Sequence, residues 1–147
     1  MSTLEQAPDR YTMRIRTSLP YDDAVARVRN ALAEQGFGVL TEVDVRATMK
    51  AKLDVDVPAQ VILGACRPEL AHRALTAAPS IAALLPCNVV VRDAGDGTTV
   101  VEAIDPDAMA RLESGPVVAS VAAEARTRLR DALDRLDVLD VPDVREA

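Results

Sequence analysis

Residues 118–136 carry the apolar pattern that most restricts the fold of this chain. Apolar side chains recur there at spacings of three and four over more than four helical turns. They are Val118, Val121, Ala122, Ala125, Leu129, Ala132, Leu133 and Leu136. Such a spacing places all of them on one face of an α-helix, and a face of this length has to be buried. We therefore predict that this helix lies across a β-sheet as its main cover.

Five shorter segments have the pattern of β-strands. Residues 11–18 and 39–45 alternate between apolar and polar side chains, and residues 60–66 are almost continuously apolar, as in an inner strand. Residues 87–93 and 98–104 flank the sequence AGDG, whose residues tolerate the positive φ of a tight turn. These last two segments are predicted to form a hairpin.

A second major helix and three short ones account for much of the remaining chain. Residues 20–35 carry an inward stripe, and Gly36 suits the left-handed position that ends a helix. Residues 46–53 and 68–78 are predicted to form short helices. A further short helix follows Asp105, which is its expected N-cap.

These elements predict the fold class α+β: a two-layer sandwich with a mainly antiparallel sheet of about five strands, covered by two major helices. One domain is expected over residues 11–137, between flexible tails at residues 1–10 and 138–147. Alternation places six charged residues on the uncovered face, where they form either a solvated charge ladder or a surface for a ligand or subunit. They are Arg14, Arg16, Glu42, Asp44, Arg92 and Glu102.

The charge and composition argue against two classes of partner. The formal charge of −6 opposes the phosphates of nucleic acids and of a membrane surface, and two tyrosines and one phenylalanine offer few stacking platforms for bases. No apolar run approaches the roughly 18 residues needed to cross a bilayer. We therefore expect no nucleic-acid or membrane partner and a cytoplasmic location. A homodimer is expected, because one helical layer leaves the other face or an edge of a small sheet uncovered.

One stretch, residues 61–91, contains both cysteines and the only histidine of the chain. Cys66, Cys87 and Arg67 are candidate ligand-binding residues, and Cys66, Cys87 and His72 are candidate ligands for a soft metal. Cys66 stands between a strand end and a helix start, where the helix dipole favours a thiolate. If the two strands are antiparallel neighbours, both cysteines share one rim of the sheet. The alternative is that the cysteines are small buried hydrophobic residues and His72 is an ordinary surface residue.

Three segments of the sequence resemble those of a known family. They are GFGVLTEVDVRATMKAKLDVDVP, ILGACRPELAHRAL and LLPCNVVV, and with them the chain resembles the domain of unknown function family 302 from about Tyr11 to Leu136. The resemblance implies an α+β fold related to that of the TATA-binding protein, often as a homodimer, and no established activity. Cys66, Pro68 and Cys87 match the family signature, whereas Arg67 stands where the family commonly has asparagine.

Three functions are consistent with these observations. The first is a small-ligand or soft-metal binding module that uses the rim with Cys66 and Cys87. The second is a structural or protein interaction module, and the third is a thiol-dependent enzyme. The common phosphate-loop, nucleophile-elbow and zinc-helix motifs are absent from the sequence, which indicates no particular cofactor.

Overall fold

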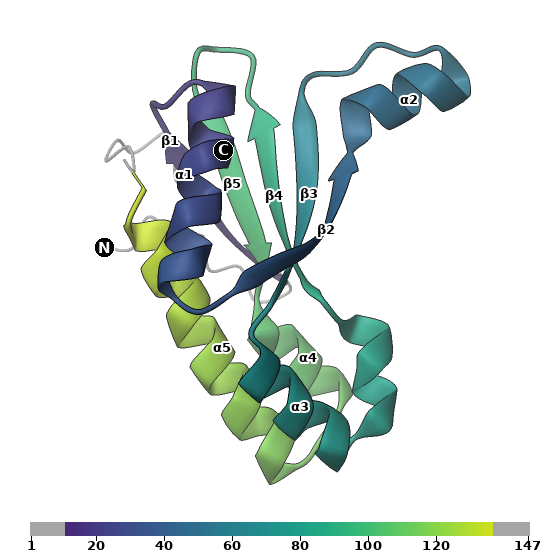
Figure 1. Cartoon of the computed structure of the whole chain (residues 1–147), viewed down its shortest axis with the longest axis vertical. Helices are drawn as coiled ribbons and strands as arrows, with labels where there is room; N and C mark the ends of the chain where they lie inside the picture. The colour runs from purple at the N-terminus through teal and green to yellow at the C-terminus, as the bar shows by residue number, and fades with distance from the viewer. Residues whose placement is uncertain (1–10, 137–147) are drawn as a thin grey trace.

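The computed structural model describes residues 11–136, which form a five-stranded antiparallel sheet with helices on one face (Figure 1). The strand order is β1-β5-β4-β3-β2. The strands are β1 (Thr12–Thr17), β2 (Gly38–Asp44), β3 (Gln60–Cys66), β4 (Cys87–Asp93) and β5 (Thr99–Ile104). The predicted fold class is therefore confirmed, including the β4–β5 hairpin. The tails predicted at residues 1–10 and 138–147 lie outside the described residues.

Two long helices, α1 (Tyr21–Glu34) and α5 (Pro116–Asp134), bury their apolar stripes against the sheet and against each other. The α5 stripe is the one predicted from the sequence, from Val118 to Leu133, and Leu136 just beyond the helix is also buried. Alternating strand residues such as Met13, Leu63 and Val91 supply the other half of the core. The core is thus formed by one sheet face and two helix faces.

Three shorter elements form a second group of helices beyond the end of the sheet (Figure 1). They are α3 (Pro68–Ala77), the 3₁₀ helix η1 (Pro79–Leu84) and α4 (Pro106–Leu112). Both α3 and α4 pack against α5. Asp105 caps α4 as predicted, because its carboxylate accepts a hydrogen bond from the backbone N–H of Asp107 at 3.0 Å. This group closes the end of the core from which β3 leaves and at which β4 enters.

The helix α2 (Val45–Leu53) projects from the edge strand β2, and none of its residues is buried. The alternating pattern of residues 39–45 predicted that Val45 is the last residue of a strand. In the structure the carboxylate of Asp44 accepts a hydrogen bond from the Ala47 N–H at 2.9 Å, so that it is the N-cap and α2 begins at Val45.

The prediction that Glu42 and Asp44 lie on the face away from the helices was wrong. A register shift between Val39 and Thr41 places Glu42 opposite the buried Leu63, on the helix side of the sheet, where it pairs with Arg29 of α1. An extra residue in one strand reverses which face the following side chains occupy. Arg14, Arg16, Arg92 and Glu102 do share the uncovered face, because the register pairs Arg14 with Glu102 and Arg16 and Arg92 with Val100.

On the uncovered face, the side chains of Thr41 and Pro86 lie close to the backbone of Gly64. A Cβ atom at this position would overlap the Thr41 hydroxyl and would lie 2.7 Å from Cγ of Pro86. Both neighbours therefore use the space that the missing side chain leaves.

Among the described residues no helix combines the length and hydropathy that a membrane span needs.

Candidate functional site

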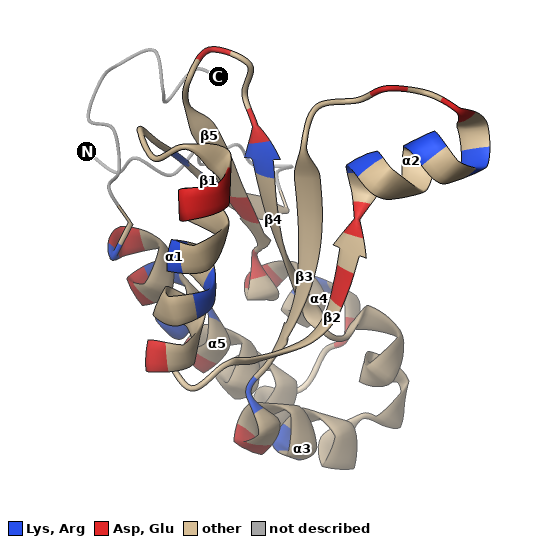
Figure 2. Ribbon diagram, turned by 45° about the horizontal axis from the view of Figure 1, so that its top comes forward, with Lys and Arg blue, Asp and Glu red and all other residues tan. Residues whose placement is uncertain are grey.

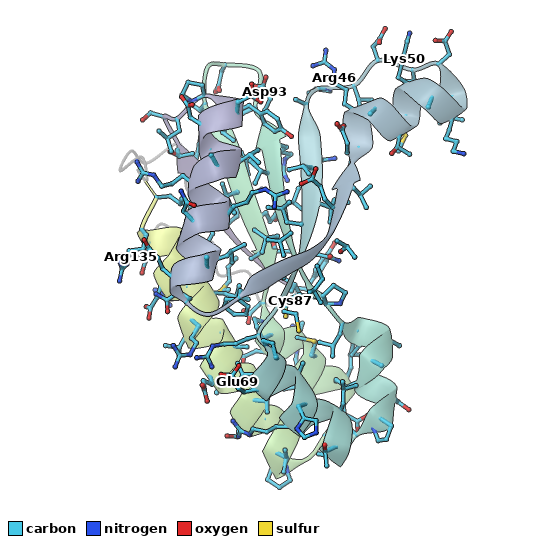
Figure 3. The ribbon with its side chains drawn as sticks, in the orientation of Figure 1. Arg46, Lys50, Glu69, Cys87, Asp93 and Arg135 are labelled. Carbon is cyan, nitrogen blue, oxygen red and sulfur yellow. The ribbon has the colours of Figure 1, made fainter. Side chains whose placement is uncertain are left out.

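An apolar cavity of about 50 Å³ lies where the end of the sheet meets the second group of helices. Its wall is formed by residues 65–67 at the end of β3, by Cys87 at the start of β4, and by side chains of α3, η1, α4 and α5. Phe37, Ile81, Met109 and Ala122 are among the residues that line it. We call this space the end cavity. Figure 3 shows Cys87 at this junction of sheet and helices.

The local sequence explains why a cavity remains there. Pro68 occupies the first turn of α3, so that the chain turns from β3 directly into the helix. Where α3 faces α5, small side chains line the gap: Ala71 and Ala74 on one side, Ala122 and Ala125 on the other. Alanine lets helices pack but leaves space where a larger side chain would reach further.

Among residues 11–136, Arg67 is the only charged residue that borders the end cavity, and the wall itself is almost entirely apolar. Its side chain is only 17% exposed. Its Nε atom donates to the carbonyl oxygen of Gln35 at 3.1 Å, and its Nη1 atom lies 3.5 Å from Oε2 of Glu124. Gly36, with φ 82°, makes room, because a Cβ atom there would lie 2.8 Å from Nε of Arg67. Arg67 is therefore held in place by the turn after α1 and by α5.

The two cysteines are free thiols with unfavourable conditions for ionisation. Burial, with a smaller contribution from Cys66, raises the pKa of Cys87 to about 11, and burial also raises the pKa of Cys66. The expectation that the start of α3 favours a Cys66 thiolate is therefore wrong. Removal of the thiol from water disfavours its charged form and raises its pKa at this position.

The predicted cysteine pair is not formed. The two strands are antiparallel neighbours, but the register places Cys87 opposite Ala65 and not opposite Cys66. Cys87 therefore faces the helices together with Ala65. Cys66 follows Ala65 at the end of β3 and is only half-buried. Three of the four candidate residues, Cys66, Arg67 and Cys87, nevertheless border the end cavity.

The predicted metal ligands are not brought together either. His72 is exposed and borders a separate surface depression with Arg73 and Val117. Within residues 11–136 no three side chains of histidine, cysteine, aspartate or glutamate form a group that could hold a metal ion. The reason is the helical geometry of α3, which directs His72 away from the buried face that contains Leu70 and Ala74.

The charged residues on the uncovered face form a bonded network. Arg92 Nη1 lies 2.8 Å from Oε1 of Glu102, and Thr12 Oγ1 donates to Oε2 of the same carboxylate at 2.6 Å. Burial by itself would raise the pKa of Glu102, but the hydrogen bonds from Thr12 and Arg92 and the nearby positive charges hold it below its usual value. Much of the charge on this face is therefore neutralised by ion pairs and hydrogen bonds between its own residues.

Several residues of the end cavity were not identified from the sequence. Phe37, Met109 and Ala122 come from three distant parts of the chain, and of these only Ala122 was singled out, as part of the apolar stripe of residues 118–136. The sequence pointed only to Cys66, Arg67 and Cys87 as site residues, because they lie in the segments that resemble the family.

Comparisons with known proteins agree with the fold and leave the chemistry of the site open. The sequence matches the family described as Domain of unknown function DUF302 over residues 12–136. The structure is similar to the crystal structure of an uncharacterized conserved protein DUF302 from Bacillus stearothermophilus, with a TM-score of 0.79 and 28% sequence identity. That match covers 86% of this chain and 98% of the other. A search of curated proteins found no match.

Proposed function

The chain belongs to the DUF302 family, and from this premise we propose that it is a small-ligand binding module whose site is the end cavity. The observation that carries the proposal is a preformed apolar space that is bordered by one charged residue among those described, Arg67. Small-molecule sites typically combine an apolar lining with a few fixed polar groups. The elements around it belong to the sheet and to four helices, so that the space is held by a rigid scaffold.

The raised pKa values of the two thiols argue against a thiol-dependent enzyme. A nucleophilic cysteine needs a thiolate near neutral pH, whereas the pKa of Cys87 is raised to about 11 and that of Cys66 is raised as well. A soft metal would also have to displace a proton from a buried thiol, and the described residues provide no third ligand nearby. A neutral cavity wall is the role that fits Cys87.

We expect xenon to bind in the end cavity and the substitution Ala122→Val to abolish that binding. Xenon occupies apolar protein cavities, and two added methyl groups on this wall would fill much of the about 50 Å³. Methyl chemical shifts under xenon pressure measure occupancy. The gain from burying the methyl groups is partly offset by the cost of a β-branched residue in α5, so that the free energy of unfolding should stay within about 1 kcal/mol of the wild type.

Ala123→Val is the matched control for this test, because Ala123 is the exposed neighbour on α5. It carries the same helix-propensity cost and leaves the end cavity unchanged. Xenon shifts at Met109 should persist in this variant. Absence of xenon-induced shifts around the end cavity of the wild type would contradict the proposed function.

We further propose that the chain forms a homodimer through β2 and α2, an interaction role favoured by one specific observation. Four of the seven large apolar residues that are exposed among those described lie on this edge: Leu40, Val43, Leu53 and Val55. The strand β2 is the last strand at one edge of the described sheet, and α2 buries no residue. Figure 2 shows positive residues on α2 close to negative residues on β2 and on the loop after α2, a pattern suited to a second copy.

A cytoplasmic location is proposed because both thiols are free.

Light scattering should give twice the 15.7 kDa mass of the chain at micromolar concentration. Leu53→Asp should shift the mass toward that of the monomer, because a carboxylate would be buried in the apolar contact. Leu112→Asp is the matched control: Leu112 is 74% exposed on α4, compared with 65% for Leu53, and lies outside the proposed interface. A monomer mass for the wild type would contradict the dimer.

A further inference from the structure

We propose that the ligand of the end cavity is a short aliphatic carboxylate, with its alkyl group in the cavity and its carboxylate on Arg67. This inference rests on the proposed function and adds the chemical class of the ligand. It follows from two properties of the site. They are the volume of the apolar space and the long distances between the two neighbouring carboxylates and Arg67, the one cationic residue among those described that borders this space.

The volume restricts the apolar part of the ligand. A cavity of about 150 Å³ holds benzene, and a water molecule takes about 30 Å³ of liquid. The end cavity, at about 50 Å³, therefore has room for an alkyl group of about two or three carbon atoms. Its wall contains Phe37, Ile81 and Met109, which offer contacts to carbon and no strong hydrogen-bond partner.

Arg67 supplies the complementary polar contact. Its Nη1 atom is 3.5 Å from Glu124 and 3.7 Å from Glu69, whereas a charge-assisted hydrogen bond of arginine to a carboxylate is about 2.7–2.9 Å long. Figure 3 shows Glu69 at the start of α3, below the junction with Cys87. The guanidinium is thus largely removed from water. It donates hydrogen bonds to the Gln35 carbonyl oxygen at 3.1 Å and to Glu124 at 3.5 Å, and a ligand carboxylate would add a shorter charge-assisted contact.

The charges around Arg67 also favour an anion. Arg73 and Arg128 lie at 3.5 Å from the same Glu124 carboxylate, so that three arginines share two carboxylates, those of Glu69 and Glu124. This leaves one positive charge in excess. The N-terminus of α3, which begins directly after Arg67, adds a partial positive charge at the same point.

The test is a titration of the full chain with butanoate and with butan-1-ol, followed by methyl chemical shifts of the end cavity. The two probes have alkyl groups of similar size and differ in charge. Butanoate should bind about tenfold more tightly, as expected for one charge-assisted contact. Its advantage should decrease with added salt, because an ionic contact that is partly exposed is screened. Equal affinities for the two probes would overturn the inference.

Arg67→Met should reduce the preference for butanoate to less than about twofold, because the substitution keeps the apolar length of the side chain and removes its charge. Arg128→Met is the matched control, since Arg128 lies at the same distance from Glu124 but is not on the wall of the end cavity. It should keep the preference. An equal loss in both variants would overturn the assignment to Arg67 and point to net charge instead. If Arg67→Met fails to fold, the salt dependence in the wild type still decides the question.

A third probe, octanoate, distinguishes a short free acid from a lipid-derived chain. A cavity of this volume should bind octanoate no more tightly than butanoate. Much tighter binding of octanoate would overturn the short-chain assignment. Xenon binding without any preference for butanoate would leave the proposed function standing and refute only this inference, whereas absence of xenon binding would refute the proposed function.

Discussion

Replacing Leu129 with alanine is expected to lower the free energy of unfolding by about 3 kcal/mol. Leu129 is 1% exposed in the C-terminal half of α5. It lies with Leu32 of α1 and Val89 of β4 around a gap of only about 10 Å³, so that truncation creates a new cavity between both helices and the sheet. Buried leucine-to-alanine changes typically cost about 2–5 kcal/mol. Urea denaturation at neutral pH measures the effect.

Leu112→Ala makes the same chemical change at a residue that is 74% exposed on α4. It should change the free energy of unfolding by less than about 0.5 kcal/mol. A loss below about 0.5 kcal/mol for Leu129→Ala as well would show that α5 is not the main cover of the sheet.

The fold could be predicted to this extent because each element has to bury one face. The spacing along α5 leads to residues that are all buried in the structure, including Ala125 and Leu133, since a helix stripe and a sheet face are mutually required. Alternation also identified Met13 and Ile15 of β1 as inward-facing residues. These patterns depend on local periodicity, which the sequence displays directly.

The orientation of β2 could not be obtained in this way. Periodicity assumes an uninterrupted strand, whereas the register shift between Val39 and Thr41 changes the face on which Glu42 and Asp44 lie. Val43 is therefore 44% exposed although it alternates correctly with its neighbours in sequence. A bulge depends on pairing with β3 and has no reliable local signal.

The sequence predicted where the candidate site lies, but neither its cavity nor its chemistry. The family segments pointed to Cys66, Arg67 and Cys87, and all three border the end cavity. The cavity itself results from what small side chains such as Ala74 and Ala122 leave unfilled, a property of three-dimensional packing. The raised pKa of Cys66 could not be predicted for a similar reason, because the depth of burial is not visible in the sequence.

Cys87 should make the stability of the protein decrease as the pH rises from about 9 to about 11. Burial, with a smaller contribution from Cys66, raises the pKa of this thiol from 9.0 to about 11, so that the folded state keeps a proton that the unfolded chain loses in this range. The stabilising contribution is complete below about pH 9 and is lost as the pH approaches the folded-state pKa. A difference of about two pKa units corresponds to about 2–3 kcal/mol.

Cys87→Ala isolates this contribution when urea denaturation is repeated between pH 8 and pH 11. The pKa values of Tyr21 and Cys66 are also raised, mainly by burial, so that both groups reduce the stability of the wild type and of the variant in the same direction. The effect of Tyr21 cancels in the comparison, and that of Cys66 cancels except for its smaller electrostatic coupling to Cys87. The wild type should lose about 2 kcal/mol more than Cys87→Ala over this range, because only the wild type has to ionise a thiol in the end cavity. Parallel pH profiles for the two proteins would show that Cys87 is accessible to water, and the apolar wall that both proposals require would then be open at this point.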